Sequence, residues 1–106
     1  LLVTRTSMKK EVFLELVASP SDTLLLDIRE TDELTDDNQI EGTVHMPMGK
    51  VFCEAVQDKL PKDKAIVVFC RSGMRAAVVV QELTKSGYMI DGLEGGLNSL
   101  GNTQSL

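Results

Sequence analysis

The sequence predicts one α/β domain built around a mainly parallel sheet. Strand-like and helix-like patterns alternate along the chain, and this alternation is typical of parallel strands joined by helical crossovers. Residues 65–69 form an uninterrupted apolar run with three β-branched side chains, as expected for a buried strand. A length of 106 residues suits a single compact domain. We therefore expect one domain over residues 1–106, with its core at about residues 3–100 and a polar tail at residues 101–106.

The first half of the chain is expected to begin with a short strand at residues 1–5. Ser7 is a suitable N-cap for a helix whose apolar residues recur at helical spacing until Pro20 ends it. Residues 24–28 are almost wholly apolar, which predicts a central strand covered on both faces. The acidic stretch at residues 30–37 has weak apolar periodicity, so we expect a short helix and a loop whose charges face water.

The second half repeats the alternation of strands and helices. Gly87 stands where a glycine commonly ends a helix, and Lys85 lies in the last turn before it. The expected elements, in order, are a strand at 43–46, a helix at 49–60, the strand at 65–69, a helix at 74–86, a strand at 88–90, a turn at Gly95-Gly96 and a short terminal helix.

Composition and charge exclude several classes of function. The net charge of -5 disfavours nucleic acid and anionic membrane surfaces as partners. No apolar run approaches the roughly 18 residues that a membrane-spanning helix needs, and residues 1–5 lack the order of a signal peptide. The chain lacks an initial Met, which agrees with a processed form or a piece of a longer protein. We expect a cytoplasmic location.

The most informative segment lies between the strand at 65–69 and the helix at 74–86. Open parallel sheets bind ligands at such junctions, where backbone N–H groups and a helix amino end favour an anion. Arg71 and Arg75 add positive charge, which predicts a lowered pKa for the Cys70 thiol, and Gly73 permits a tight turn. The candidate site comprises Cys70 as nucleophile and the loop residues Arg71, Ser72, Gly73, Met74 and Arg75.

Other candidate residues have structural alternatives. Cys70 alone would suit a small buried core position, although two arginines and a glycine beside it fit that interpretation poorly. Asp27 and Arg29 follow a central strand, and we expect them to support the site rather than to react. His45 is interpreted as structural, and Cys53 as a core residue in preference to one that resolves a persulfide. The spacing of these residues predicts no metal site, and no cofactor is expected.

Five motifs in order resemble those of the rhodanese-like superfamily over nearly the whole chain, from about Val3 to Leu100. The departures are Leu34, Gln39 and Leu100, which stand where the family often has an aromatic residue, a histidine and a tryptophan. We interpret Gln39 and Leu100 as structural substitutions. The motifs are Leu25-Leu26-Asp27-Ile28-Arg29-Glu30, its continuation Glu33-Leu34, Ile40-Glu41-Gly42-Thr43-Val44-His45-Met46-Pro47, Leu60-Pro61-Lys62-Asp63-Lys64, and Leu93-Glu94-Gly95-Gly96-Leu97.

The resemblance implies about five mainly parallel strands flanked by helices on both faces, with Cys70 carrying a persulfide. Four residues separate Cys70 from Arg75, whereas related phosphatases and arsenate reductases have five, so the tighter loop favours a terminal sulfur over an oxyanion. The implied activity is a sulfurtransferase that takes sulfur from a small thiosulfate- or persulfide-type donor and passes it to a thiol, cyanide-like or protein-thiol acceptor. The alternative is a persulfide carrier or partner-docking module within a larger protein.

Overall fold

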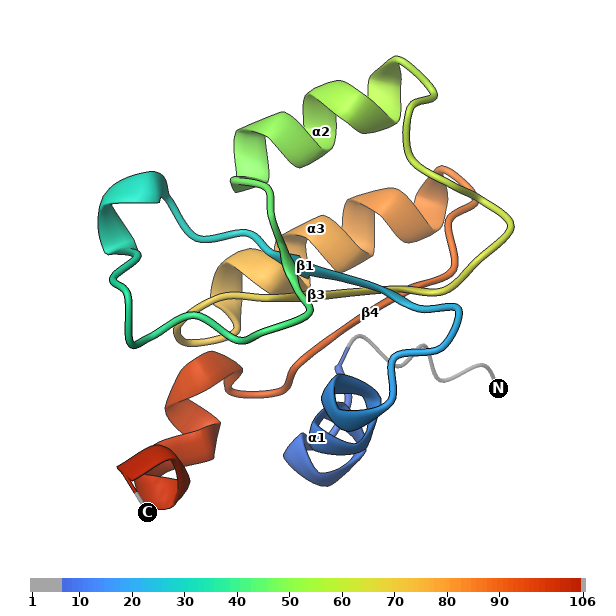
Figure 1. The fold of residues 1–106 in the computed structure, drawn as a ribbon. Helices are drawn as coiled ribbons and strands as arrows, with labels where there is room; N and C mark the ends of the chain where they lie inside the picture. Colours follow the sequence, from blue (N-terminus) through green and yellow to red (C-terminus); the bar gives the residue numbers. More distant parts are fainter. Residues whose placement is uncertain (1–6, 106) are drawn as a thin grey trace.

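The protein folds as a parallel sheet with helices on both faces, as the sequence predicted (Figure 1). The structure is a computed structural model that describes residues 7–105. Its elements are α1 (Lys10–Ala18), β1 (Leu24–Asp27), the 3-10 helix η1 (Thr31–Glu33), β2 (Val44–His45), α2 (Met48–Val56), β3 (Ile66–Phe69), α3 (Met74–Lys85), β4 (Ile90–Gly92) and the kinked 3-10 segment η2 (Gly96–Ser105).

The described residues form a four-stranded sheet in the order β2-β1-β3-β4, with every pair parallel. The strand predicted at residues 24–28 is therefore central, between β2 and β3. The short strand predicted at residues 1–5 lies outside the described residues. Beside β4, Met8 forms an isolated parallel bridge with Leu93. Because all strands run the same way, their carboxyl ends meet at one edge of the sheet, where the loops after β1 and β3 lie together.

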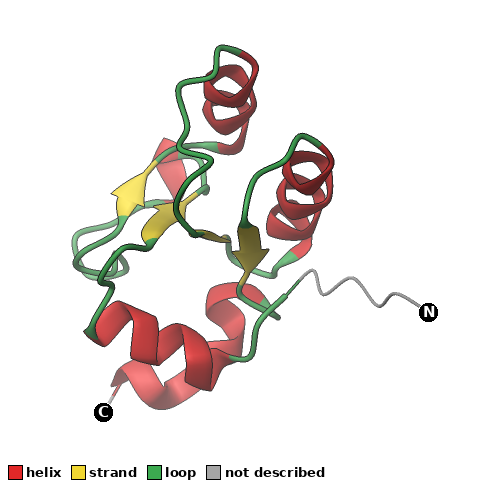
Figure 2. Cartoon of the chain, turned by 90° about the vertical axis from the view of Figure 1, so that its right-hand side faces the viewer, coloured by secondary structure: helices red, strands yellow, loops and turns green. Residues whose placement is uncertain are grey.

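Two helical layers cover the sheet, α1 and η2 on one face and α2 and α3 on the other (Figures 1 and 2). Successive side chains of β3 point to opposite layers, as the two-residue period of a strand requires. Val67 and Phe69 pack with Phe13 of α1 and Leu100 of η2. On the other face, Ile66 and Val68 pack with Val51 of α2 and with Val79, Val80 and Leu83 of α3. The apolar run in β3 is thus explained by burial on both faces.

Two helix boundaries differ from the sequence prediction. Ser7 is not the N-cap of α1, because Met8 pairs beside β4 and the helix begins only at Lys10. The helix predicted at residues 49–60 ends at Val56. There Asp58 adopts a left-handed backbone with φ of +58°, and its N–H donates to the Ala55 carbonyl at 3.1 Å, which terminates the helix without glycine.

The boundaries of α3 agree with the prediction, and this helix begins directly after the Cys70 loop. Gly87 has a φ of +94°, and its N–H donates to the Thr84 carbonyl at 3.1 Å while the Tyr88 N–H donates to the Leu83 carbonyl at 3.1 Å. This pair of bonds is a Schellman cap and ends the helix where the glycine was expected to end it. Among the described residues, no helix is long and apolar enough to cross a bilayer.

Candidate active site

Cys70 is the first residue after β3, and three residues separate it from α3. Its side chain is fully buried, with 0% of the residue exposed. The Gly73 N–H donates a hydrogen bond to the Cys70 Sγ at 3.2 Å, so the loop turns back and points a backbone donor at the sulfur. Such a donor stabilises a sulfur anion more than a neutral thiol. Because the sulfur is buried, a reagent can reach it only when the groups that cover it move.

The first two carbonyl groups of the Cys70 loop are held by the start of η2. The Leu97 N–H donates to the Cys70 carbonyl at 2.8 Å, and the Asn98 N–H donates to the Arg71 carbonyl at 2.9 Å. Gly96 permits this approach, because a Cβ atom there would lie 2.5 Å from both carbonyl oxygens. With the Cys70 and Arg71 carbonyls engaged by η2, the Gly73 N–H is the loop donor that points at Sγ.

Gly73 is the second glycine that the loop requires. It adopts a left-handed backbone with φ of +96° and immediately precedes α3. An added Cβ would meet the Gly95 nitrogen at 3.0 Å, so the Gly95-Gly96 turn and the Cys70 loop pack backbone against backbone. Side chains at these positions would separate the two loops.

The guanidinium group of Arg75 forms a bidentate ion pair with Glu33. Arg75 Nη1 and Nη2 donate to the two carboxylate oxygens at 2.6 and 2.9 Å. Arg71 Nε lies 3.6 Å from Glu33 Oε2. The hydrogen bond with Arg75 is the main reason that the pKa of Glu33 falls from 4.5 to about 2, and the hydrogen bond donated by the Glu30 N–H lowers it further. The same hydrogen bond raises the pKa of Arg75, and the negative charge of Glu33 raises it further.

The sequence prediction that the charges at residues 30–37 face water is wrong for Glu33. Its side chain is 21% exposed and lies close to both Arg71 of the loop and Arg75 of α3. Local pattern gave no sign of this contact, because Arg75 is 42 positions further along the chain. The signal that was available is the place of Glu33 in one of the motifs that resemble the superfamily.

Asp27 at the end of β1 and Arg29 just beyond it form a buried ion pair, each 2% exposed. Arg29 Nη2 donates to Asp27 Oδ2 at 2.8 Å and to the Asn38 carbonyl at 2.9 Å. The Asn38 side-chain amide in turn donates to the Glu33 carbonyl at 3.1 Å. The pair thus anchors the loop that carries Glu33.

The other predicted residues lie at different depths around the loop. Arg71 and Met74 are exposed, the Met74 residue by 76% and the Arg71 side chain by 56%, while the Ser72 Oγ accepts a bond from the Met74 N–H at 3.4 Å. His45 Nε2 lies 2.7 Å from the Arg29 carbonyl, as suits a structural residue. The interpretation of Cys53 as a core residue is wrong, because this cysteine on α2 is exposed.

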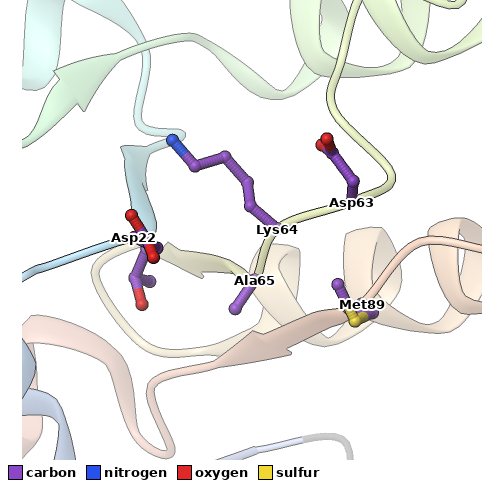
Figure 3. A pocket seen from close by; sticks show the side chains of 6 residues that line it. Asp22, Asp63, Lys64, Ala65 and Met89 are labelled. Atoms are coloured by element: carbon purple, nitrogen blue, oxygen red, sulfur yellow. The ribbon is translucent and has the colours of Figure 1, made fainter.

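A hollow of about 620 Å³ lies away from Cys70, at the amino ends of the strands (Figure 3). It is lined by the residues that immediately precede β1, β3 and β4, among them Thr23, Ala65 and Met89, with the charged side chains of Asp22, Asp63 and Lys64 at its rim. Because parallel strands place Cys70 at their other ends, this hollow does not belong to the candidate site. Over residues 7–105 the structure shows no cluster of three or more His, Cys, Asp or Glu that could hold a metal ion.

Comparison with known proteins assigns this arrangement to a family. The model of the rhodanese-like domain matches residues 10–103. The "Putative sulfurtransferase YtwF" of Bacillus subtilis is 34% identical over 83 residues, which cover 78% of each chain. A protein named "Sulfurtransferase" from Allochromatium vinosum is 32% identical over 82 residues, which cover 76% of this chain and 74% of that protein.

The solved structures agree with this assignment. The crystal structure of reduced CoADR-RHD from Bacillus anthracis superposes with a TM-score of 0.77 at 25% identity, and it covers 95% of this chain but only 17% of that one. The chain described here therefore belongs to the rhodanese-like domain family, as its motifs indicated. In the Bacillus anthracis protein, the matching part is a small fraction of a much longer chain.

Proposed function

We propose that this domain is a sulfurtransferase that carries a sulfane sulfur as a persulfide on Cys70. The observation that carries the proposal is the hydrogen bond that the Gly73 N–H donates to the Cys70 Sγ. This bond lies at the junction of β3 and α3, beside Arg71 and Arg75. The names of two relatives, both sulfurtransferases, support it independently.

The chemistry is a double displacement. With thiosulfate, the Cys70 thiolate attacks the outer sulfur, the sulfur–sulfur bond breaks, and sulfite leaves with the bonding electrons. The product is the Cys70 persulfide anion, and no oxidant or reductant is consumed. A thiophilic acceptor, either cyanide or a thiolate, then attacks the outer sulfur and regenerates the Cys70 thiolate. These two successive displacement steps predict ping-pong kinetics.

A second function is favoured by the burial of Cys70. A fully buried thiol beside an exposed Met74 suits a persulfide carrier whose loop opens when a partner protein docks. The match to a small part of a much longer chain in Bacillus anthracis also suits a module of a larger protein. In this case Cys70 accepts sulfur but transfers it slowly to small acceptors.

Steady-state turnover with thiosulfate and cyanide separates the two functions, and Cys70→Ser is the control. Turnover that Cys70→Ser abolishes supports the free-standing sulfurtransferase. Persulfide formation with negligible turnover supports the carrier. Turnover that survives in a folded Cys70→Ser variant refutes both, because serine cannot form a persulfide.

A further inference from the structure

The acidic residue Glu33 lies between the two arginines that were expected to bind the donor. Both of its carboxylate oxygens accept hydrogen bonds from Arg75, and one lies 3.6 Å from Arg71 Nε. Arg75 thus directs two of its donors at Glu33. The side chains of Arg75 and Glu33 are 31% and 21% exposed, so water screens this pair less than a fully exposed one.

The positive charges around Cys70 are therefore offset by neighbouring negative ones. Arg71 and Arg75 bring two positive charges, and the carboxylate of Glu33 together with a Cys70 thiolate brings two negative ones. Glu30 adds a further negative charge that is felt by Arg75. A donor approaching the thiolate meets no surplus of positive charge from these five groups. The cost of bringing up negative charge rises with the charge of the donor.

From this arrangement we infer that Glu33 is a positioning residue that selects the donor, favouring hydropersulfides of small thiols over dianionic thiosulfate. The inference rests on the proposed function, since it names the donor class for the same Cys70 site. Thiosulfate carries two negative charges, whereas a hydropersulfide without other ionisable groups carries at most one. The carboxylate of Glu33 acts through Arg75, because it binds the Arg75 guanidinium and so keeps that group away from the sulfur donor.

The favoured step balances without a further reactant. The Cys70 thiolate attacks the outer sulfur of R–S–SH, the sulfur–sulfur bond breaks, and the thiolate R–S⁻ leaves with the electron pair. The transferred sulfur keeps its proton, so the product is Cys70–S–SH. The donor enters neutral and the charge of the Cys70 thiolate leaves with R–S⁻, so the site need not stabilise a second negative charge.

The test compares the rates at which two donors load Cys70, with Cys53→Ser as the background so that Cys70 is the only thiol. The donors are thiosulfate and the hydropersulfide of 2-mercaptoethanol, and loading is followed by intact-mass spectrometry. Glu33→Gln keeps the shape of the side chain and removes its charge. Asp32→Asn is the matched control, because it removes the same charge from an exposed neighbour.

We expect Glu33→Gln to raise the second-order loading rate with thiosulfate about tenfold and to change the rate with the hydropersulfide by less than about threefold. Asp32→Asn should change the ratio of the two rates by less than about twofold. A ratio that Glu33→Gln leaves unchanged would overturn the inference while the proposed function stands. No loading by either donor would overturn both.

A second measurement needs only the Cys53→Ser background and so does not depend on the folding of Glu33→Gln. If Glu33 neutralises the site, thiosulfate loading should vary less than about twofold between low and physiological ionic strength. A tenfold fall in the loading rate as salt is added would show that the site attracts the dianion with free positive charge, and the inference would be wrong.

Discussion

Replacement of Gly96 by alanine tests the backbone arrangement that shapes the Cys70 loop. Gly96 has a φ of +60°, and a Cβ atom there would lie 2.5 Å from the carbonyl oxygens of both Cys70 and Arg71. Since these are backbone atoms, no side-chain rotation relieves the contact. The start of η2 must move away from the loop, which weakens the bonds that the Leu97 and Asn98 N–H groups donate to those carbonyls.

The expected loss of stability follows from these terms. The left-handed backbone costs alanine about 1 kcal/mol. Two weakened hydrogen bonds cost about 1 kcal/mol each. The free energy of unfolding of Gly96→Ala should therefore fall by about 3 kcal/mol, which lowers Tm by about 12 °C or more in a domain of this size. Loading of Cys70 with sulfur should slow as well, because the loop loses its support.

Gly42→Ala is the matched control. Gly42 also has a positive φ, of +89°, but a Cβ atom there would have nothing within 4 Å. We expect this variant to lose about 1 kcal/mol from backbone strain alone. Urea denaturation of both variants measures the difference. If Gly96→Ala is no less stable than Gly42→Ala, close packing of the two loops does not determine the shape of the site.

Two further predictions concern the ion pairs. Arg29→Ala should lower the free energy of unfolding by about 3 kcal/mol or more, because it leaves the Asp27 carboxylate buried without its partner. Urea denaturation measures this loss, with Lys85→Ala in the exposed pair with Glu82 as the control. A loss below about 1 kcal/mol, similar to that of the control, would contradict the prediction. The pKa of Glu33 is lowered to about 2, so the stability from its charge is present above about pH 4.5 and is lost as pH falls toward 2. Wild type should therefore lose about 1 kcal/mol more than Glu33→Gln over that range, and equal acid sensitivity of the two in denaturant titrations would refute the assignment.

The elements that the sequence predicted well are those whose signals are local. Strand β3 and helix α3 could be predicted because burial on both faces makes a strand apolar throughout, and because Gly87 supplies its own capping geometry. The position of Cys70 between them follows from these two elements alone. The amino-acid sequence is therefore sufficient to propose a nucleophile at this strand–helix junction.

The features that the sequence did not reveal depend on contacts between distant segments. Glu33 resembles one solvated acid among several, because its partner Arg75 is brought to it only by the parallel pairing of β1 with β3. The late start of α1 reflects the pairing of Met8 beside β4 rather than any property of Ser7. The sequence predicts only a turn at Gly96. It does not reveal that this residue approaches the Cys70 and Arg71 carbonyls, which leave no room for a side chain.

The central claim is that Cys70 accepts a transferable sulfur, and intact-mass spectrometry of the Cys53→Ser variant tests it most directly. After incubation with thiosulfate or a small hydropersulfide, we expect the mass to rise by one sulfur atom and to return on addition of cyanide. The folded double variant Cys53→Ser/Cys70→Ser should gain nothing. A folded Cys53→Ser protein that never gains this mass with either donor would contradict the claim.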